Sequence, residues 1–395
     1  MTTADIVIVG GGIIGTCLAY HLAQRGATRV VLLEREELAA GSSGRATGGI
    51  RQQFADEIDI RFSIAGVRFY EQFTRETAAC PPFYQYGYLF FATDTHAWEN
   101  LQRYAALQQA LGVPTQLLNA AQVQQRIPQL FVDDIAGATF CPTDGYSNPG
   151  AMAQALATEA QTRGVRIMTH SPVIAIHVIN GRVQAVQTPD ETIATPIVVN
   201  ATGAYAALTA RLVGMNNLPV YPLRRQLYLT ETLTESDLPN DVPMTVDLHT
   251  GFHFRRRDGR VVLTMPLPIS AEEMQRNRGL EPDAFKLNVD EDFWQRAIRP
   301  ELAHRCPTLA HVPIAQVWTG LYEMTPDEHP VLGKTEIEGF YCACGFSGHG
   351  FMHAPMAAQL MTELLLDGAS SILPIEQFSI ERFRTGKLIE MTPML

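Results

Sequence analysis

Three glycines near the start of the chain have the spacing of a nucleotide-binding turn. Gly10, Gly12 and Gly15 follow the apolar residues 6–9 and fit the pattern G-x-G-x-x-G. Gly10 permits a tight turn, Gly12 lets a pyrophosphate approach the backbone, and Gly15 lets a helix pack closely on a strand. Free N–H groups at the start of the following helix, beside Ile14, attract phosphate. The pattern therefore predicts a dinucleotide site.

A second apolar strand and an acidic residue complete this signal. Residues 30–33 form the expected strand, and Glu34 ends it 24 positions after Gly10. A carboxylate at this position accepts hydrogen bonds from ribose hydroxyls. Arg35 either favours a phosphorylated ribose or is a solvated charge. The motif alone does not distinguish FAD from NAD, and a glycine-rich turn in an ordinary βαβ unit is the alternative interpretation.

Two more glycine-rich segments are expected to approach the same ligand. Residues 41–51 (GSSGRATGGIR) contain too much glycine for a stable helix or strand and predict a loop. Residues 345–350 (GFSGHG) follow an apolar strand and precede a helix, with Pro355 expected in its first turn. The positive end of that helix would face the ligand, unless the loop only caps a surface helix. The candidate cofactor contacts in these segments and near a small-residue turn at residue 201 are Ser42, Ser43, Arg45, Val173, Ala201, Gly203, Gly345, Ser347, Gly348, His349, Gly350, Phe351 and Met352.

These segments, together with residues 318–330 (WTGLYEMTPDEHP), resemble the D-amino-acid oxidase superfamily of FAD enzymes. The likeness is greatest to the branch of sarcosine oxidase β subunits, glycine oxidases and proline-type amino-acid dehydrogenases, and it covers nearly the whole chain. The resemblance implies FAD as cofactor and a small carboxylate-bearing amine as substrate. It further implies that the C–N bond of an amino, imino or N-alkyl amino acid is oxidised to an imine by hydride transfer to flavin N5, followed by hydrolysis.

The resemblance also implies three catalytic candidates. Arg51 matches the arginine that binds the substrate carboxylate, although an arginine here also suits an FAD phosphate or a surface ion pair. His349 would hydrogen-bond the flavin or the substrate amine, or bond only to the loop backbone. Tyr322 occupies the position of a carboxylate-binding arginine in glycine oxidases, and core packing is its alternative role. His253 and either Arg225 or its neighbour are further candidates on a second sheet.

The sequence departs from the family pattern at two reactive positions. Monomeric sarcosine oxidases attach FAD to a cysteine where this chain has Gly320, which predicts non-covalent FAD. Their oxygen-activating lysine has no match, because residues 1–285 contain no lysine. A dehydrogenase, or a subunit that passes electrons to a partner, is therefore favoured over an oxidase. The alternative function is a flavin-bound, non-catalytic assembly protein or partner subunit of a heteromeric complex.

The pattern of elements predicts an α/β protein. A Rossmann-like FAD-binding domain of the GR2 type would be combined with an α+β substrate domain built on an antiparallel sheet. Because nucleotide-binding segments lie at both ends of the chain, the first domain is expected to be discontinuous. The expected divisions are 1–80, 142–215 and 316–375 for the FAD-binding domain, 81–141 and 216–315 for the substrate-binding domain, and 376–395 for a C-terminal tail.

Composition and charge exclude several functional classes. A chain with 46% hydrophobic and 18% charged residues is not disordered. Its net charge of -11 argues against a nucleic-acid partner and against binding to an anionic membrane. No apolar run approaches the roughly 20 residues that span a bilayer, and no signal peptide precedes the first strand, so a cytoplasmic protein is expected. The six cysteines lack metal-ligand spacing, His329 is interpreted as structural, and no metal is expected.

Overall fold

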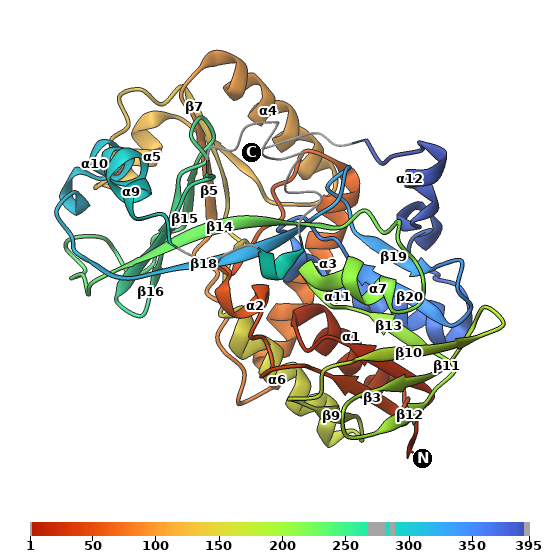
Figure 1. The fold of residues 1–395 in the computed structure, drawn as a ribbon. Coiled ribbons are helices and arrows are strands. Elements are labelled where there is room, and N and C mark those ends of the chain that lie inside the picture. Colours follow the sequence, from red (N-terminus) through yellow and green to blue (C-terminus); the bar gives the residue numbers. More distant parts are fainter. Residues whose placement is uncertain (1, 268–280, 285–288, 391–395) are drawn as a thin grey trace.

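Two large β-sheets organise the chain in the computed structural model, which describes residues 2–267, 281–284 and 289–390 (Figure 1). The six-stranded sheet has the order β19-β20-β13-β2-β3-β9, and its neighbours run parallel except for the antiparallel edge strand β19. This sheet confirms the predicted Rossmann-like α/β class. Its strands are β2 (Ile6–Val9), β3 (Val30–Leu33), β9 (Arg166–Met168), β13 (Val198–Asn200), β19 (Val331–Lys334) and β20 (Phe340–Cys344).

Both faces of the six-stranded sheet are covered, because β2 and β3 are apolar and buried at every position. The side chains of Ile6, Ile8 and Leu32 pack against helices, whereas those of Val7 and Val31 pack on the opposite face. The helices are α1 (Ile13–Gln24), α3 (Glu57–Glu76), α6 (Pro149–Thr162) and α11 (Gly350–Asp367). The opposite face carries α7 (Ala206–Arg211) and a sheet of β1 (Thr2–Thr3), β12 (Thr192–Ala194), β11 (Arg182–Gln187) and β10 (Ala175–Ile179).

The eight-stranded sheet has the order β18-β14-β17-β16-β15-β5-β7-β6, and only the pair β15 and β5 is parallel. Along β5, Leu89 and Phe91 enter a core with α5 (Ala120–Arg126) and α10 (Arg299–Arg305), while Tyr88 and Phe90 face the other side. The long strands β14 and β18 reach from this sheet towards the six-stranded one (Figure 1). The strands are β5 (Tyr88–Ala92), β6 (Gln116–Leu118), β7 (Gly137–Cys141), β14 (Tyr221–Thr230), β15 (Met244–Asp247), β16 (His253–Arg257), β17 (Arg260–Thr264) and β18 (Ile314–Met324).

The two large sheets take their strands from different ranges of the chain. All six strands of the first large sheet fall in the ranges expected for the FAD-binding domain. Seven strands of the second fall in the ranges expected for the substrate-binding domain, and β18 crosses the limit at residue 316. The domain limits themselves stay a prediction.

Residues 41–51 are not the simple loop that their glycine content predicted. They contain one helical turn, α2 (Ser42–Arg45), and a short strand, β4 (Gly49–Ile50). Gly44 lets α2 approach the preceding backbone, since a Cβ there would lie 2.5 Å from the carbonyl oxygen of Ala39. The partner of β4 is β8 (Gly145–Tyr146), nearly 100 positions away. Local composition did not reveal the two elements because this pairing is distant in sequence.

Pro355 lies in the interior of α11 and not in its first turn, as the sequence had suggested. A proline at this position donates no hydrogen bond, so the carbonyl of Phe351 loses its helical partner. The hydroxyl of Tyr70 on α3 donates to that carbonyl at 2.7 Å. Gly66 allows α3 to come this close, because a Cβ there would lie 2.0 Å from the carbonyl oxygen of Met352. The neighbouring helix thus satisfies the group that the proline exposes.

The segment expected as a C-terminal tail begins as packed structure. It includes η5 (Ile375–Phe378) and α12 (Glu381–Thr385), and the side chain of Phe378 is fully buried in the core around α3 and α11. Arg382 binds the carboxylate of Asp327 through bonds of 2.7 and 3.0 Å. Residues 391–395 lie outside the described residues.

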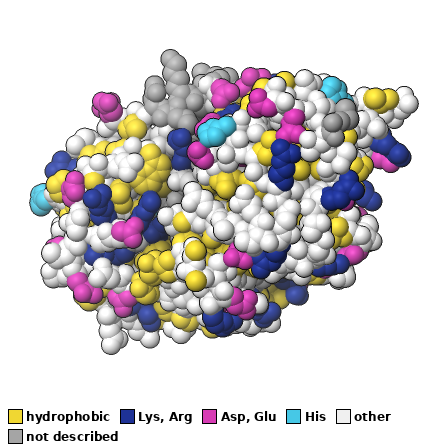
Figure 2. All heavy atoms as spheres, turned by 90° about the horizontal axis from the view of Figure 1, so that it is seen from below, with side chains coloured by type: hydrophobic (Ala, Val, Ile, Leu, Met, Phe, Trp, Pro, Cys, Tyr) yellow, Lys and Arg dark blue, Asp and Glu magenta, His cyan; other side chains and the backbone are white. Residues whose placement is uncertain are grey.

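The surface of the molecule carries charged side chains of both signs, as the composition predicts (Figure 2). On the face drawn in Figure 2, basic and acidic side chains are interspersed. Among the described residues, no helix combines the length and the apolar character that crossing a membrane requires.

Candidate active site

A cavity of about 920 Å³ lies between the carboxyl ends of β2, β3 and β13 and the inner face of the eight-stranded sheet. It collects most of the residues singled out from the sequence, including all three catalytic candidates. Gly15 and Gly345 are the two candidates that do not line it. The candidates that do are Gly10, Gly12, Ile14, Glu34, Arg35, Ser42, Ser43, Arg45, Arg51, Val173, Ala201, Gly203, Tyr322, Ser347, Gly348, His349, Gly350, Phe351 and Met352.

The turn between β2 and α1 requires glycine at two positions. Gly10 has a φ of +114°, and a Cβ there would lie 2.4 Å from the carbonyl oxygen of Ala201. At Gly15, a Cβ would lie 1.9 Å from the carbonyl oxygen of Gly10, so this residue sets the packing of α1 on the strand. Gly12 precedes α1 and has no side chain to cap the helix. The start of α1 therefore presents N–H groups to the cavity, as an anion site requires.

Glu34 and Arg35 occupy the far end of the cavity, where the βαβ unit would hold a ribose. The carboxylate of Glu34 accepts bonds from the backbone N–H groups of Gly11 at 2.7 Å and Glu36 at 2.9 Å. The guanidinium of Arg35 lies 3.8 Å from the ring centroid of Tyr205. Tyr205 also lines the cavity and was not found from the sequence. Its position two residues after Gly203 was the only available signal.

The α2 segment is fastened to β18 by polar contacts. Ser42 donates its hydroxyl to the carbonyl of Leu321 at 2.6 Å, and Arg45 donates to the carbonyl of Thr319 at 3.1 Å. Ser43 Oγ accepts from the N–H of Ile13 at 2.9 Å. These bonds use the side chains to join α1, α2 and β18 along one wall of the cavity. They hold the side chain of Arg45 against β18, and its expected contact with the cofactor stays a prediction.

The loop before α11 forms the opposite wall. Gly345 supports this loop from outside the cavity: it has a φ of +78° and donates its N–H to Glu323 Oε2 at 3.0 Å. Burial raises the pKa of Glu323 to about 7. His349 precedes the first residue of α11, and its ring meets the edge of Phe54 at 5.0 Å. Burial and the charge of Arg51 lower the pKa of His349 to about 3, so its imidazole is neutral at physiological pH.

Arg51 places a buried cation at this cavity. Arg51 is only 5% exposed, and its guanidinium donates a hydrogen bond to the carbonyl of Gln53. The guanidinium carbon lies 3.8 Å from the ring centroid of Phe54 and 5.3 Å from that of Phe90. Burial lowers the pKa of the guanidinium, while the nearby hydroxyl of Tyr88 and carboxyl of Asp59 act in the opposite direction. The position is the one expected of a residue that binds an anion away from bulk water.

The eight-stranded sheet forms the wall opposite these loops, with both apolar and polar side chains. Tyr88 and Met244 are buried and line the cavity, as does the half-buried His253. Burial lowers the pKa of His253 to about 4, and its Nδ1 lies 2.9 Å from the carbonyl oxygen of Gly251. The guanidinium of Arg225 lies 5.0 Å from the ring centroid of Tyr322, and both residues line the cavity. One of the two adjacent arginines thus enters the site, as the strand alternation predicted.

Comparisons with known proteins agree with this arrangement. A model of the DAO family, described as FAD dependent oxidoreductase, matches residues 5–364. The chain belongs to this family. FAD-dependent oxidoreductase domain-containing protein 1 of Xenopus laevis is 29% identical over 96% of this chain and 82% of that protein. Human mitochondrial sarcosine dehydrogenase is 28% identical over 93% of this chain, which corresponds to 40% of that protein.

Solved structures of DAO family members share the fold over nearly the whole chain. The crystal structure of L-proline dehydrogenase from P. horikoshii superimposes with a TM-score of 0.90 at 29% identity, covering 98% of this chain and 100% of that one. Glycine oxidase from Bacillus cereus, at 22% identity and a TM-score of 0.78, shows the fold alone. The family is one of FAD dependent oxidoreductases, so this chain is an FAD flavoprotein.

The helix ends and the side chains around the cavity suit FAD. The starts of α1 and α11 both open onto it, and these ends attract negative charge. Glu34 lies where ribose hydroxyls need an acceptor. Position 348 has room only for glycine, because a Cβ there would lie 2.5 Å from the ring of Tyr322. None of the described residues that line the cavity is a cysteine or a lysine.

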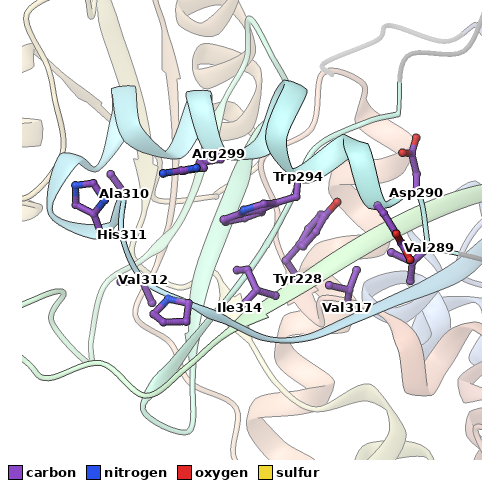
Figure 3. A pocket seen from close by; sticks show the side chains of 12 residues that line it. Tyr228, Val289, Asp290, Trp294, Arg299, Ala310, His311, Val312, Ile314 and Val317 are labelled. Atoms are coloured by element: carbon purple, nitrogen blue, oxygen red, sulfur yellow. The ribbon is translucent and has the colours of Figure 1, made fainter.

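A second, smaller cavity of about 440 Å³ lies elsewhere in the eight-stranded part of the molecule (Figure 3). It is bordered by the first residues of β18 and by η3 (Trp294–Ile298), a π-helical turn. The rings of Tyr228 and Trp294 lie 5.2 Å apart on one of its walls. It shares no lining residue with the large cavity, and none of the residues predicted to act in catalysis reaches it.

Proposed function

We propose that this flavoprotein oxidises the C–N bond of a small amino, imino or N-alkyl amino acid to an imine, which water then hydrolyses. The observation that carries the proposal is Arg51, a buried guanidinium in the same cavity as the glycine-rich nucleotide loops. Named relatives act on such compounds: sarcosine and dimethylglycine dehydrogenases at 28% identity, and L-proline dehydrogenase at 29%.

The side chains of the cavity suit the demands of this reaction. Non-covalent FAD supplies the hydride acceptor when it is bound. Arg51 would hold the substrate carboxylate by two parallel N–H···O bonds, which fixes the position of the neighbouring C–H bond. The buried walls formed by Tyr88 and Met244 exclude water from that bond.

His349 would contribute a hydrogen bond rather than a stored proton. A pKa of about 3 keeps its imidazole neutral at physiological pH, so one ring nitrogen accepts and the other donates. Burial and the nearby charge of Arg51, which keep His349 neutral, also disfavour a protonated substrate amine, and the lone pair of the uncharged amine assists hydride loss. Tyr322, on the other side of Gly348, would orient the substrate through its hydroxyl.

An anaerobic screen of flavin reduction tests the proposal directly. The yellow holoenzyme is mixed with amino acids, N-methyl amino acids and cyclic imino acids without oxygen, and the flavin absorbance is followed. We expect bleaching by at least one compound that carries a carboxylate next to the amine. Bleaching by NAD(P)H alone, or by no compound in these classes, would contradict the proposal and favour a non-catalytic flavoprotein.

A further inference from the structure

Two carboxylates and a histidine meet behind the large cavity without lining it. Asp56 precedes the first residue of α3, Asp59 lies in its first turn, and His329 lies between β18 and β19. His329 Nε2 is 3.8 Å from Asp56 Oδ1 and 3.8 Å from Asp59 Oδ1. One donor atom from each residue can be chosen so that all three lie within 4.8 Å of one another. These three residues are called the carboxylate–histidine cluster below.

The imidazole of His329 is held as a metal-binding histidine would be. Its side chain is 2% exposed, and its Nδ1 lies 2.7 Å from the carbonyl oxygen of Asp327. This contact makes Nδ1 a donor and leaves Nε2 facing the two carboxylates. Nε2 is buried and makes no hydrogen bond with any described residue. Histidine ligands characteristically donate their second ring N–H to a carbonyl or carboxylate in this way.

The surroundings of the cluster are rigid. The carboxylate of Asp327 is held by Arg382 through bonds of 2.7 and 3.0 Å, which fixes the turn that carries His329. Asp56 Oδ1 accepts the N–H of Asp59 at 2.9 Å, which fixes the start of α3. The second oxygen of Asp56 does not take part in that bond. Such support keeps ligand atoms in place before an ion arrives.

Charge and geometry in the cluster favour a divalent cation. Two carboxylates face one imidazole in a largely buried place, and burying like charges together is costly unless a cation lies between them. The carboxylates raise the pKa of His329 to about 9, so zinc would have to displace the proton on Nε2. A tetrahedral zinc site has ligand atoms about 3.3–3.6 Å apart, given metal–ligand distances of roughly 2.0–2.2 Å. His329 Nε2 lies 3.8 Å from each carboxylate and all three atoms lie within 4.8 Å of one another, so they need to close by only about an ångström to reach this spacing. One nitrogen and two carboxylate oxygens are ordinary zinc ligands.

We propose that Asp56, Asp59 and His329 form a binding site for one zinc ion, which ties the start of α3 to the turn between β18 and β19. The ion would also affect the neighbouring cavity. Asp59 interacts with the charge of Arg51, so a cation at the cluster would leave more of that charge for an anionic ligand. None of the three residues lines the large cavity, so zinc binding can be measured without substrate or turnover.

Zinc titration of the chelator-treated holoenzyme tests this site. We expect calorimetry with zinc chloride to show one ion bound per chain and binding weakened about tenfold or more in Asp56→Asn. Asparagine also caps helices well, so this variant keeps the start of α3 and changes only the charge. His329→Gln provides a second variant, and retained flavin absorbance shows that either one is folded. His170→Gln is the control, because His170 pairs with Glu37 at 2.9 Å on the surface.

The identity of the ligands is read from zinc X-ray absorption. We expect a shell of nitrogen and oxygen without sulfur, although the chain has six free cysteines. The proposal is overturned if the wild type binds no zinc, since a protonated His329 would then be the permanent counter-ion of the carboxylates. It is also overturned by a sulfur shell, or by unchanged binding in both Asp56→Asn and His329→Gln.

Discussion

Arg51 is the residue on which substrate recognition depends in the proposed reaction. Replacing it with methionine keeps the apolar contact with Phe54 but removes the charge and the paired donors. Charge-assisted hydrogen bonds contribute about 1.5–3 kcal/mol each, so flavin reduction at low substrate should slow at least about 100-fold. Stopped-flow absorbance under anaerobic conditions measures this rate, and the FAD content should stay unchanged.

The matched control for this substitution is Arg61→Met on α3. Arg61 is exposed and pairs with Glu57 at 2.7 Å, so the change should leave flavin reduction as it is. Loss of FAD from Arg51→Met, with normal reduction by the remaining holoenzyme, would show that Arg51 serves the cofactor and not the substrate.

Glu323 makes stability depend on pH. Its folded-state pKa is raised by burial from 4.5 to about 7, so the folded protein keeps a proton that the unfolded chain releases. The free energy of unfolding contributed by this group therefore falls as the pH rises from about 4.5 to about 7. Glu323→Gln keeps an oxygen acceptor for Gly345 and removes the ionisation. Thermal denaturation at pH 5 and pH 8 should show the variant gaining several degrees in Tm over wild type at pH 8 only.

Residue types alone located much of the candidate site but not its long-range contacts. Most of the motif glycines, together with Glu34, Arg51 and His349, stand in motifs whose spacing carries the signal, and the structure brings them to one cavity. Tyr205 and the carboxylate–histidine cluster carry no such signal. Asp59 and His329 are 270 positions apart in the sequence and meet only through the packing of α3.

At the scale of elements, the contact between α3 and α11 depends on one hydroxyl. Tyr70→Phe removes the donor at 2.7 Å from the carbonyl of Phe351, which Pro355 has already deprived of its helical bond. A buried carbonyl left without a partner costs about 1–3 kcal/mol. Urea denaturation should show the free energy of unfolding reduced by that amount. Tyr84→Phe, at a residue that is 38% exposed, is the control and should change stability little.

The packing of α1 on β2 leaves no room for a side chain at the third motif glycine. In Gly15→Ala the new methyl group would meet the carbonyl oxygen of Gly10 at 1.9 Å, so α1 must move away from the turn. We expect FAD content after purification to fall several-fold, measured by flavin absorbance against protein concentration. Gly150→Ala at the start of α6 meets nothing closer than 3.4 Å and should retain its FAD. Normal FAD content in Gly15→Ala would contradict this account of the motif.

Elements with strong local patterns were predictable, and those that depend on distant partners were not. The strands β2 and β3 are continuous apolar runs, and α1 follows directly from the glycine turn. In contrast, β4 exists because β8 pairs with it, and α2 because it is bonded to β18. The proline of α11 was misplaced for the same reason, since its compensating hydroxyl comes from another helix.

For the whole molecule, the choice of electron acceptor is the property that decides its role. Reduced flavins react rapidly with oxygen when a compact positive charge stabilises the superoxide that forms first. The sequence has no lysine before residue 286, and none of the described residues that line the cavity is a lysine. The guanidinium of Arg51 already contacts the ring of Phe54 and donates to the carbonyl of Gln53, and it would also bind the substrate carboxylate. It would therefore stabilise superoxide poorly.

We therefore expect the isolated holoenzyme to be reduced quickly by its substrate and reoxidised slowly by oxygen. Double-mixing stopped-flow gives both rates: the flavin is first reduced anaerobically and then exposed to oxygen or to an artificial acceptor dye. Reoxidation by oxygen should be at least about tenfold slower than by the dye, as for an enzyme that passes electrons to a partner protein. Peroxide formed as fast as the flavin is reduced would instead establish an oxidase. In that case an arginine of the cavity is the candidate, among the described residues that line it, to supply the charge that oxygen requires.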